Sequence, residues 1–466
     1  TIYLFFPFAQ RNEGLRERLG SYKVSVNITS FRELFVIYKK KSLQAYVSKV
    51  TINGLDRTKD DYVHNVLKDC IDITNVRDLV EKVKEVRETL LAIGAFKEVR
   101  AKIDVTPGTK YGYIVDFNCV EMRRIKGNVS TEMNQYEMVS KAEILLPNLQ
   151  GRGESLGFDY AYSNSNNSKR NVGLNVKFQK PFLHRSIIGK YRPVTSLHLF
   201  DNTSKSYSNT YTNHTAGGSI NLVFNTSHYV QHTLQYELSF RELAGINRQV
   251  PLFVRHHFGP RLASVVRYIL KYDDRTDRIF PRTGTMLWTT LESSIFRKLG
   301  DIHYMSITSH LERNLPLFWN MSLQMTARGG FMRELSPEKP IPINSLFTMG
   351  GPYSLRGFEF GGVGPQIEGH STGTHMFWAT GLHLWTPLPY SSYFYKFARF
   401  FRTHAFINCG NVDSSLDTMR SAAGIGLAVA LGQFARIELN FTRPIQMQKG
   451  DQAAKDVQFC LGLDFI

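Results

Sequence analysis

Strand-like alternation of apolar and polar residues runs through most of this chain and limits its fold more than any other feature. It begins near residue 134, and no helical pattern of any length interrupts it after that point. One such segment reads Ala435, Arg436, Ile437, Glu438, Leu439, Asn440, Phe441 and Thr442. Because successive side chains of a strand point to opposite faces, each segment predicts a strand with one apolar and one mixed polar face.

The length of these segments favours one β architecture over another. They run for about nine or ten residues, whereas the strands of a sandwich are usually about five or six residues long. A tilted strand needs about nine to eleven residues to cross a bilayer, with its apolar face toward lipid and its polar face toward a water-filled lumen. At about 21 residues per strand and connection, residues 125–466 predict an all-β transmembrane barrel of about 16 antiparallel strands. A large soluble β-protein is the alternative that the pattern alone leaves open.

Composition excludes two other classes of protein. Charged residues make up 21% of the chain and no apolar run reaches the roughly 18 residues that a spanning helix needs, so a helical membrane protein is excluded. Aromatic residues make up 12%, too many for a disordered chain. The 57 Lys and Arg residues outnumber the 40 Asp and Glu residues, but they are scattered, and the longest basic run is Lys39–Lys41. This predicts no nucleic-acid binding and favours contact with anionic lipid or an acidic partner.

Motifs for catalysis or cofactor binding are weak. Gly369–Gly373 matches G-x-S-x-G, but a nucleophile elbow needs a strand before it and a helix after it, and a strand pattern follows here. The cysteines form no C-x-x-C pair and are far apart, so they indicate neither a metal site nor a disulfide framework: Cys70, Cys119, Cys409 and Cys460. No phosphate-binding loop is present. We therefore expect a protein that is not an enzyme and that uses no metal or cofactor.

The convincing helix signals lie within residues 46–124. A short strand ends at Gly54, and Thr58 is expected to cap the helix that follows. A second helix is expected from about Asn75 to Ile93, with Gly94 at its C-terminal cap. Two strand patterns follow, over residues 96–105 and 111–120. The order β-α-α-β-β predicts a small α+β domain, preceded by an N-terminal extension of residues 1–45.

This small domain resembles a POTRA domain, the polypeptide-transport-associated module of outer-membrane assembly proteins. The resemblance rests on V-x-I-x-G at Val50–Gly54 and on L-x-x-x-G-x-F at Leu90–Phe96. An ordinary packing domain with the same order of elements is the alternative reading.

A long connection at residues 333–373 carries the most specific motif of the chain. Hairpins need far fewer residues, and ordered loops of this length are usually functional. Its core, Leu355, Arg356, Gly357 and Phe358, resembles the [IV]-R-G-[FY] signature of the bacterial surface antigen superfamily. The resemblance implies that this loop folds back inside the barrel.

Three further segments resemble the same superfamily and suggest where the loop docks. They are Phe280–Gly284, Phe406–Gly410, and Gly424–Gly426 followed by Arg436 to Pro444. Bacterial relatives carry Asp where this chain has Asn408, so we expect Arg356 to bond main-chain carbonyls or a lumenal carboxylate such as Glu438. The expected docking wall is therefore Asn408, Gly410 and Glu438.

Taken together, the domain order and these motifs resemble the core barrels of the mitochondrial sorting and assembly machinery. That resemblance implies insertion and folding of β-barrel precursors in the mitochondrial outer membrane, with the N-terminal domain facing the intermembrane space. The implied partners are β-barrel precursors, other subunits of the machinery, outer-membrane lipids and inner-membrane contact-site proteins. Two other functions stay open: a polypeptide-translocating pore of the same superfamily in a bacterial or plastid outer membrane, and a passive porin. A porin has no use for the small domain or the arginine loop.

The expected mechanism uses a lateral seam between the first and last strands. We predict the first strand at about Tyr136 to Leu146 and the last at Gln458 to Ile466. An opened seam exposes unpaired main-chain groups that an incoming strand can satisfy. The seam residues expected are Ser140, Ala142, Ile144, Phe459, Gly462 and Phe465. Cys460 replaces the glycine of the terminal pattern that the family's barrels carry.

Overall fold

The structure is a computed structural model of the 466-residue chain. It describes residues 3–4, 44–67, 70, 73–109, 111–133, 138–163, 171–181, 191, 193–205, 211–245, 250–294, 296–336, 340–388, 400–413, 417–432 and 435–462. By contacts, the chain divides into two compact units. The first consists of residues 1–127, 144–157 and 178–181, and the second contains the remainder.

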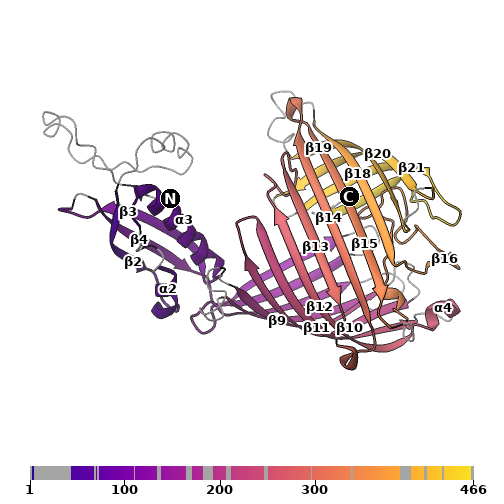
Figure 1. The fold of residues 1–466 in the computed structure, drawn as a ribbon, viewed down its shortest axis with the longest axis horizontal. Coiled ribbons are helices and arrows are strands. Elements are labelled where there is room, and N and C mark those ends of the chain that lie inside the picture. Colours follow the sequence, from indigo (N-terminus) through magenta and orange to yellow (C-terminus); the bar gives the residue numbers. More distant parts are fainter. Residues whose placement is uncertain are drawn as a thin grey trace. The chain divides into compact units, whose positions relative to one another are not determined.

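Among the described residues, the first unit contains a four-stranded sheet and two helices (Figure 1). From residue 46 onward the elements follow the predicted order β-α-α-β-β, and the two-residue strand β1 in the N-terminal extension was not predicted. The sheet order is β1-β3-β4-β2, where β3 and β4 are antiparallel and the two outer strands pair parallel to their neighbours. The elements are β1 (Tyr3–Leu4), β2 (Tyr46–Asn53), α2 (Asp60–Leu67), α3 (Val76–Ala92), β3 (Phe96–Val105) and β4 (Gly112–Glu121). The buried stripe of α3 has helical spacing: Val76, Leu79, Val83, Val86 and Leu90. Gly94 ends this helix with a φ of +77°, as the sequence predicts.

The start of α2 differs from the prediction. The Thr58 hydroxyl does not cap the helix; it donates to Glu121 Oε1 at 2.6 Å. The same carboxylate also accepts from the main-chain amides of Asp56, Arg57 and Thr58. Thr58 was a plausible cap by type and position, but a carboxylate at the end of β4 satisfies this turn instead, and no local pattern reveals that contact.

Residues of the hairpin between the strands at 138–147 and 155–163 belong to the first unit and contact the start of α2. Asn148 Nδ2 donates to Thr58 Oγ1 at 2.9 Å, and the Lys59 amide donates to the Gly151 carbonyl at 2.8 Å. Arg152 pairs with Asp61 at 2.8 Å. Gly151 has a φ of +82°, which favours glycine, and a Cβ there would also overlap the Arg57 carbonyl. The turn therefore requires glycine at this position for two reasons. These hairpin residues therefore pack as part of the N-terminal module.

A curled antiparallel sheet of sixteen strands makes up the rest of the described chain, which confirms the predicted strand number (Figure 1). The strands run in sequence order from β5 at one end of the sheet to β22 at the other. They are β5 (Lys126–Met133), β6 (Met138–Pro147), β7 (Ser155–Ser163), β8 (Asn171–Pro181), β9 (Val194–Lys205), β10 (Tyr211–Asn225), β11 (Val230–Gly245), β12 (Gly259–Asp273), β13 (Gly284–Ser293), β14 (Tyr304–Pro316), β15 (Ser322–Glu334), β18 (Met376–Pro387), β19 (Phe401–Asn411), β20 (Arg420–Leu431), β21 (Ala435–Gln446) and β22 (Val457–Gly462). Short elements lie between them: α4 (Leu252–Arg255), the two-residue strands β16 (Gln366–Ile367) and β17 (His370–Ser371), and three 3₁₀ turns at Arg297–Leu299, Phe318–Asn320 and Ile343–Ser345.

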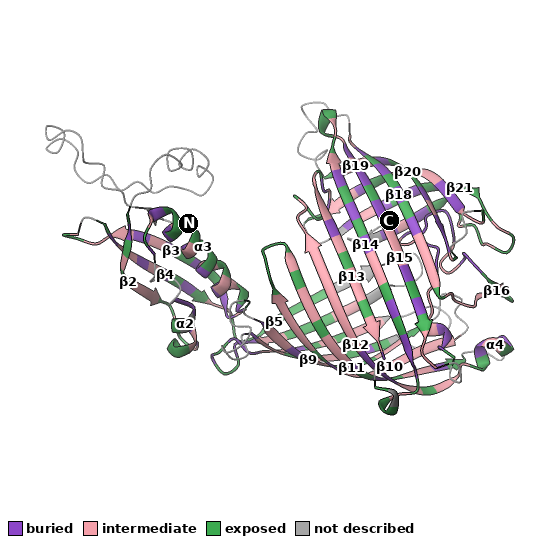
Figure 2. Ribbon diagram, viewed as in Figure 1, coloured by how far each residue is buried: buried purple, intermediate pink, exposed green. Residues whose placement is uncertain are grey.

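The two faces of this sheet differ as the alternating sequence predicts. Along β21, Glu438 and Asn440 are fully buried, whereas Leu439 and Phe441 between and beyond them are exposed. Figure 2 shows the same alternation of buried and exposed residues along β15, β18 and β19. We call the face with the buried polar side chains the inner face. The outer face is apolar and exposed, which suits contact with lipid.

The predicted first strand is corrected by the sheet order. The end strand is β5, and the strand predicted near Tyr136 to Leu146 is β6, the second strand. Ser140, Ala142 and Ile144 therefore lie one strand away from the end of the sheet. The sequence of β5, KGNVSTEM, lacks a clear apolar alternation, and this is why the pattern did not reveal it.

In the described part of the chain, no helix is both long and apolar enough to cross a membrane.

Candidate functional site

The long connection between β15 and β18 packs against the inner face of the sheet. Its residues Met349, Leu355, Phe358 and Val363 are buried and form one apolar cluster with Ala379 of β18 and Ala422 of β20. Gly357 has a φ of +89°, and a Cβ there would lie 2.6 Å from the Ala422 Cβ. The motif glycine therefore allows both the turn of the loop and its close approach to the wall.

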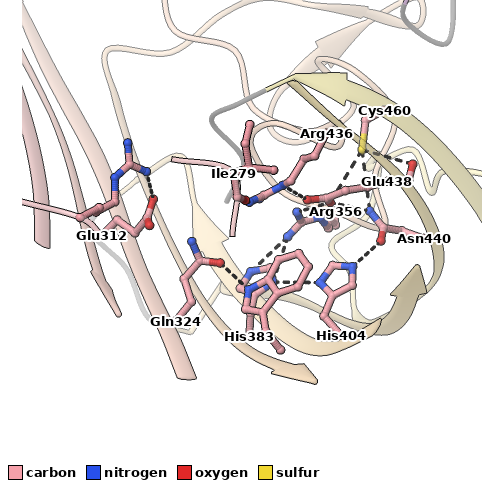
Figure 3. Close-up of polar contacts among 12 residues, drawn as sticks. Ile279, Glu312, Gln324, Arg356, His383, His404, Arg436, Glu438, Asn440 and Cys460 are labelled. Carbon is pink, nitrogen blue, oxygen red and sulfur yellow. Dashed lines mark hydrogen bonds and ion pairs between the residues drawn. The ribbon is translucent and has the colours of Figure 1, made fainter. Parts of the chain in front are cut away.

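Arg356 has the largest fully buried side chain among the described residues. Figure 3 shows its polar contacts with Glu438 and His383. Its Nη2 donates to Glu438 Oε2 at 2.8 Å, and its Nη1 lies 3.1 Å from His383 Nε2. The guanidinium carbon also lies 4.9 Å from the centre of the Phe406 ring. Its ion pair with Glu438 is the one expected from the sequence.

Glu438 is the centre of this group of charges. Besides Arg356, its carboxylate accepts from Arg436 Nε at 2.7 Å and from Asn440 Nδ2 at 3.1 Å. Two guanidinium groups thus share one carboxylate, all with side chains at most 3% exposed. The three groups together carry one net positive charge, which the His383 nitrogen and the Phe406 ring face help to stabilise.

A stack of aromatic rings lies beside these charges. The Trp385 and His404 rings are stacked with centres 4.2 Å apart, and the His404 ring is stacked on His383 at 5.7 Å. His404 Nε2 bonds Asn440 Oδ1 at 2.8 Å, which joins β19 to β21 across β20. The residue of β20 between them is Gly426, where a Cβ would overlap both bonded atoms. This explains why the Gly-x-Gly of β20 must be free of side chains at this point.

A second segment reaches the same charges. Arg436 Nη1 donates a hydrogen bond of 2.9 Å to the carbonyl of Ile279, which lies in the turn between β12 and β13. In that turn Phe280 contacts Trp385, with ring centres 5.9 Å apart. Trp385 Nε1 donates to Gln324 at 2.7 Å. The Phe280–Gly284 segment is thus brought to the inner-wall cluster, which we define as Arg356, His383, Trp385, His404, Arg436, Glu438 and Asn440.

The other predicted wall residues also contact the loop. Asn408 Nδ2 donates to the main-chain carbonyl of Arg356 at 3.2 Å, so it holds the motif through its backbone rather than its guanidinium. Gly410 faces Met349 of the loop, and a Cβ would overlap that side chain. Cys460 is buried, and its Sγ lies 3.7 Å from the main-chain carbonyl oxygen of Glu438.

The predicted seam residues that the structure describes do not all lie on the two end strands of the sheet. Phe459 and Gly462 lie on β22, but Ser140, Ala142 and Ile144 lie on β6, with β5 at the end of the sheet. Phe465 lies outside the described residues.

Sequence reasoning missed His383, His404, Arg436, Asn440 and Gln458 as site residues. All are at most 3% exposed. Their place in the sequence pattern could have indicated them. Each lies on the polar side of an alternating strand, and polar residues on that side face the loop.

The inner-wall cluster consists of charge pairs, hydrogen bonds and stacked rings. Among the described residues, no group of three or more His, Cys, Asp or Glu side chains is arranged to hold a metal ion. Ser371 lies in the two-residue strand β17, opposite β16, and is followed by residues leading into β18. That setting differs from the strand-to-helix turn of a nucleophile elbow.

Comparison with known proteins gives the family. Residues 148–465 match the model of the Omp85 superfamily domain. A SAM50-like protein of Drosophila melanogaster is 38% identical over 92% of this chain and 97% of its own length. The sorting and assembly machinery component 50 homolog of Homo sapiens is 31% identical over 90% of each chain.

Solved structures share the fold. The crystal structure of BamA from Haemophilus ducreyi lacking POTRA domains 1–3 matches with a TM-score of 0.72 and 18% identity, covering 90% of this chain and 84% of that one. CdiB from Acinetobacter baumannii matches with a TM-score of 0.56 and 13% identity, covering 90% and 74%. The chain belongs to the Omp85 superfamily and, within it, to the family of sorting and assembly machinery component 50.

Proposed function

We propose that this protein inserts and folds β-barrel precursors in the mitochondrial outer membrane. The observation that carries the proposal is similarity of 31% to 38% identity, over at least 90% of each chain, to components of the sorting and assembly machinery. The sixteen-stranded sheet with an apolar outer face is the fold that such a role requires.

The proposed mechanism is strand addition at a seam between β5 and β22. These are the two end strands, and no ladder joins them within the described residues. An end strand presents a row of unpaired N–H and C=O groups, and in a bilayer each unsatisfied group is costly. A precursor strand that pairs there satisfies these groups, and no nucleotide or metal is required for that step. The protein on this account is not an enzyme.

The N-terminal module would act before the seam. We propose that it is a POTRA domain, that it faces the intermembrane space, and that it receives precursors on their way to the end strands. The partners are then precursors, other subunits of the machinery and outer-membrane lipids. An inward loop with a buried charge cluster fits this role better than a passive pore, because it fills space that a metabolite would need.

Depletion and replacement test the proposal. Mitochondria depleted of their own barrel-assembly subunit and supplied with this chain should convert an imported β-barrel precursor into its mature, protease-resistant form. The Ser371→Ala variant should do so equally well, because the serine has no part in strand addition. Membrane-inserted protein that leaves precursors unassembled would contradict the proposed function, and loss of assembly on Ser371→Ala would favour a hydrolase.

A further inference from the structure

The last strand of the sheet is held from its inner side by main-chain atoms of the arginine motif. Gln458 of β22 accepts at its Oε1 from the Gly357 amide at 3.0 Å. Its Nε2 donates to the Phe358 carbonyl at 3.2 Å. The side chain is 1% exposed, so both of these bonds lie away from water. A primary amide matches the motif's N–H and C=O as a paired strand would, and a carboxylate or an aliphatic side chain cannot satisfy both.

The chain that leads into β22 follows the same part of the loop. The Ala454 amide donates to the Gly357 carbonyl at 3.0 Å, next to a bridge between Phe358 and Ala453. Two further bonds join Gln452 to the loop: the Glu359 amide donates to its carbonyl at 3.0 Å, and its own amide donates to the Gly362 carbonyl at 2.8 Å. The loop therefore behaves toward this connection as a neighbouring strand.

This support matters because β22 is an end strand. Its described ladder joins only β21, over the six residues Val457–Gly462. An inner strand has ladders on both sides, whereas β22 has one ladder and the loop. Gln458 is where these two supports meet, since it pairs with Asn440 in the ladder and with the motif through its side chain.

We propose that Gln458 is a positioning residue that fixes the end strand to the inward loop, and so sets the edge on which a precursor strand pairs. This rests on the proposed function of the seam. Movement of the loop would then be transmitted to β22 through Gln458 and the residues just before it. The cluster around Glu438 fixes the loop to the wall, and Gln458 extends that fixation to the strand that must exchange partners.

The test compares two Gln→Leu variants of the full chain in lipid nanodiscs. Gln458→Leu keeps the volume and removes both bonds. Gln235→Leu, on β11, is the matched control, because the Gln235 side chain makes no hydrogen bond within the part of the chain that the structure describes. Hydrogen exchange of residues 457–462 should become about tenfold faster or more in Gln458→Leu, because two bonds that hold the strand are lost, and should not change in Gln235→Leu. Unchanged exchange in Gln458→Leu would overturn the proposal.

Assembly of precursors is measured on the same proteins. Gln458→Leu should slow assembly, and normal assembly despite faster exchange would also overturn the proposed positioning role. If Gln458→Leu does not fold, as judged by heat-modifiable gel mobility, Gln458→Asn keeps the amide but shortens its reach and should show the same effects. Failure of the wild-type chain to assemble precursors would instead refute the proposed function, because the exchange comparison does not depend on precursors.

Discussion

Glu438 should be more sensitive to substitution than Arg356, although the arginine belongs to the recognisable motif. In Arg356→Ala, the Arg436–Glu438 pair at 2.7 Å remains and the charges balance. In Glu438→Gln, two buried guanidinium groups lose their shared carboxylate. The structure therefore predicts an order of stability that the motif alone does not.

The magnitudes follow from the contacts. Arg356→Ala loses three interactions: a charge-assisted bond to Glu438, a contact with His383, and a cation–π contact with the Phe406 ring. Their loss should lower the free energy of unfolding by about 3 kcal/mol in total. Glu438→Gln leaves uncompensated buried charge, which costs about 3–5 kcal/mol or more. Arg356→Lys keeps one charge but loses the planar fork, so it should restore only part of the stability lost in Arg356→Ala.

Heat-modifiable gel mobility measures this order directly. The folded fraction is recorded after a fixed heating time at a series of temperatures. The temperature at which half of the protein is unfolded should be highest for wild type, lower for Arg356→Lys, lower again for Arg356→Ala and lowest for Glu438→Gln. Assembly of precursors should slow in the same order, with membrane targeting retained. A Glu438→Gln protein as heat-resistant as wild type would refute the view that this carboxylate balances both arginines.

Two further predictions concern the wall and the N-terminal module. Gly426→Ala should destabilise the protein by about 1–3 kcal/mol and lower its thermal midpoint, because the new Cβ would overlap the bonded His404 and Asn440 atoms. Gly329→Ala on β15 is the control and should have a smaller effect, because its Cβ would lie 3.6 Å from the Phe377 carbonyl oxygen, an ordinary contact distance. Equal midpoints for the two variants would contradict this. Burial alone would raise the pKa of Glu121, but hydrogen bonds from Thr58, Arg57 and Asp56 hold that pKa below its usual range. The carboxylate therefore stabilises the module above the ordinary carboxyl range, and that stabilisation is lost as the pH falls toward the lowered pKa. Hydrogen exchange of α2, corrected for the intrinsic rate at each pH, should show protection that declines on acidification in wild type but not in Glu121→Gln; parallel pH profiles would contradict it.

Much of the fold could be predicted from the sequence because its signals are local. Alternation predicts the two faces of the strands, as along Arg436 to Phe441, and the length of residues 125–466 at about 21 residues per strand predicts their number. Strand β5 was missed because a short polar end strand has no apolar face to reveal it. The prediction that Thr58 caps α2 was wrong, because the Thr58 hydroxyl binds Glu121 instead. Glu121 is 63 residues away along the chain, so no local pattern indicates this bond.

The site was only partly predictable for the same reason. The motif around Arg356 is recognisable, and Glu438 could be proposed as the buried carboxylate it needs. The stack of His383, Trp385 and His404 depends on the register of neighbouring strands, which no local pattern gives. Gln458 is one polar residue among many on an alternating strand, and its bonds to the motif appear only in three dimensions.

A locked seam tests the central claim most directly. In a chain whose four free cysteines are replaced by alanine, single cysteines at Lys126 to Val129 of β5 are combined with one at Val457 or Phe459 of β22. Pairs that crosslink under oxidation should block maturation of imported precursors, and reduction should restore it. Matched pairs that crosslink β10 to β11, such as Ser219 with Glu237, should leave maturation unchanged. Normal assembly of new barrels through a fully crosslinked β5–β22 seam would contradict strand addition at that seam.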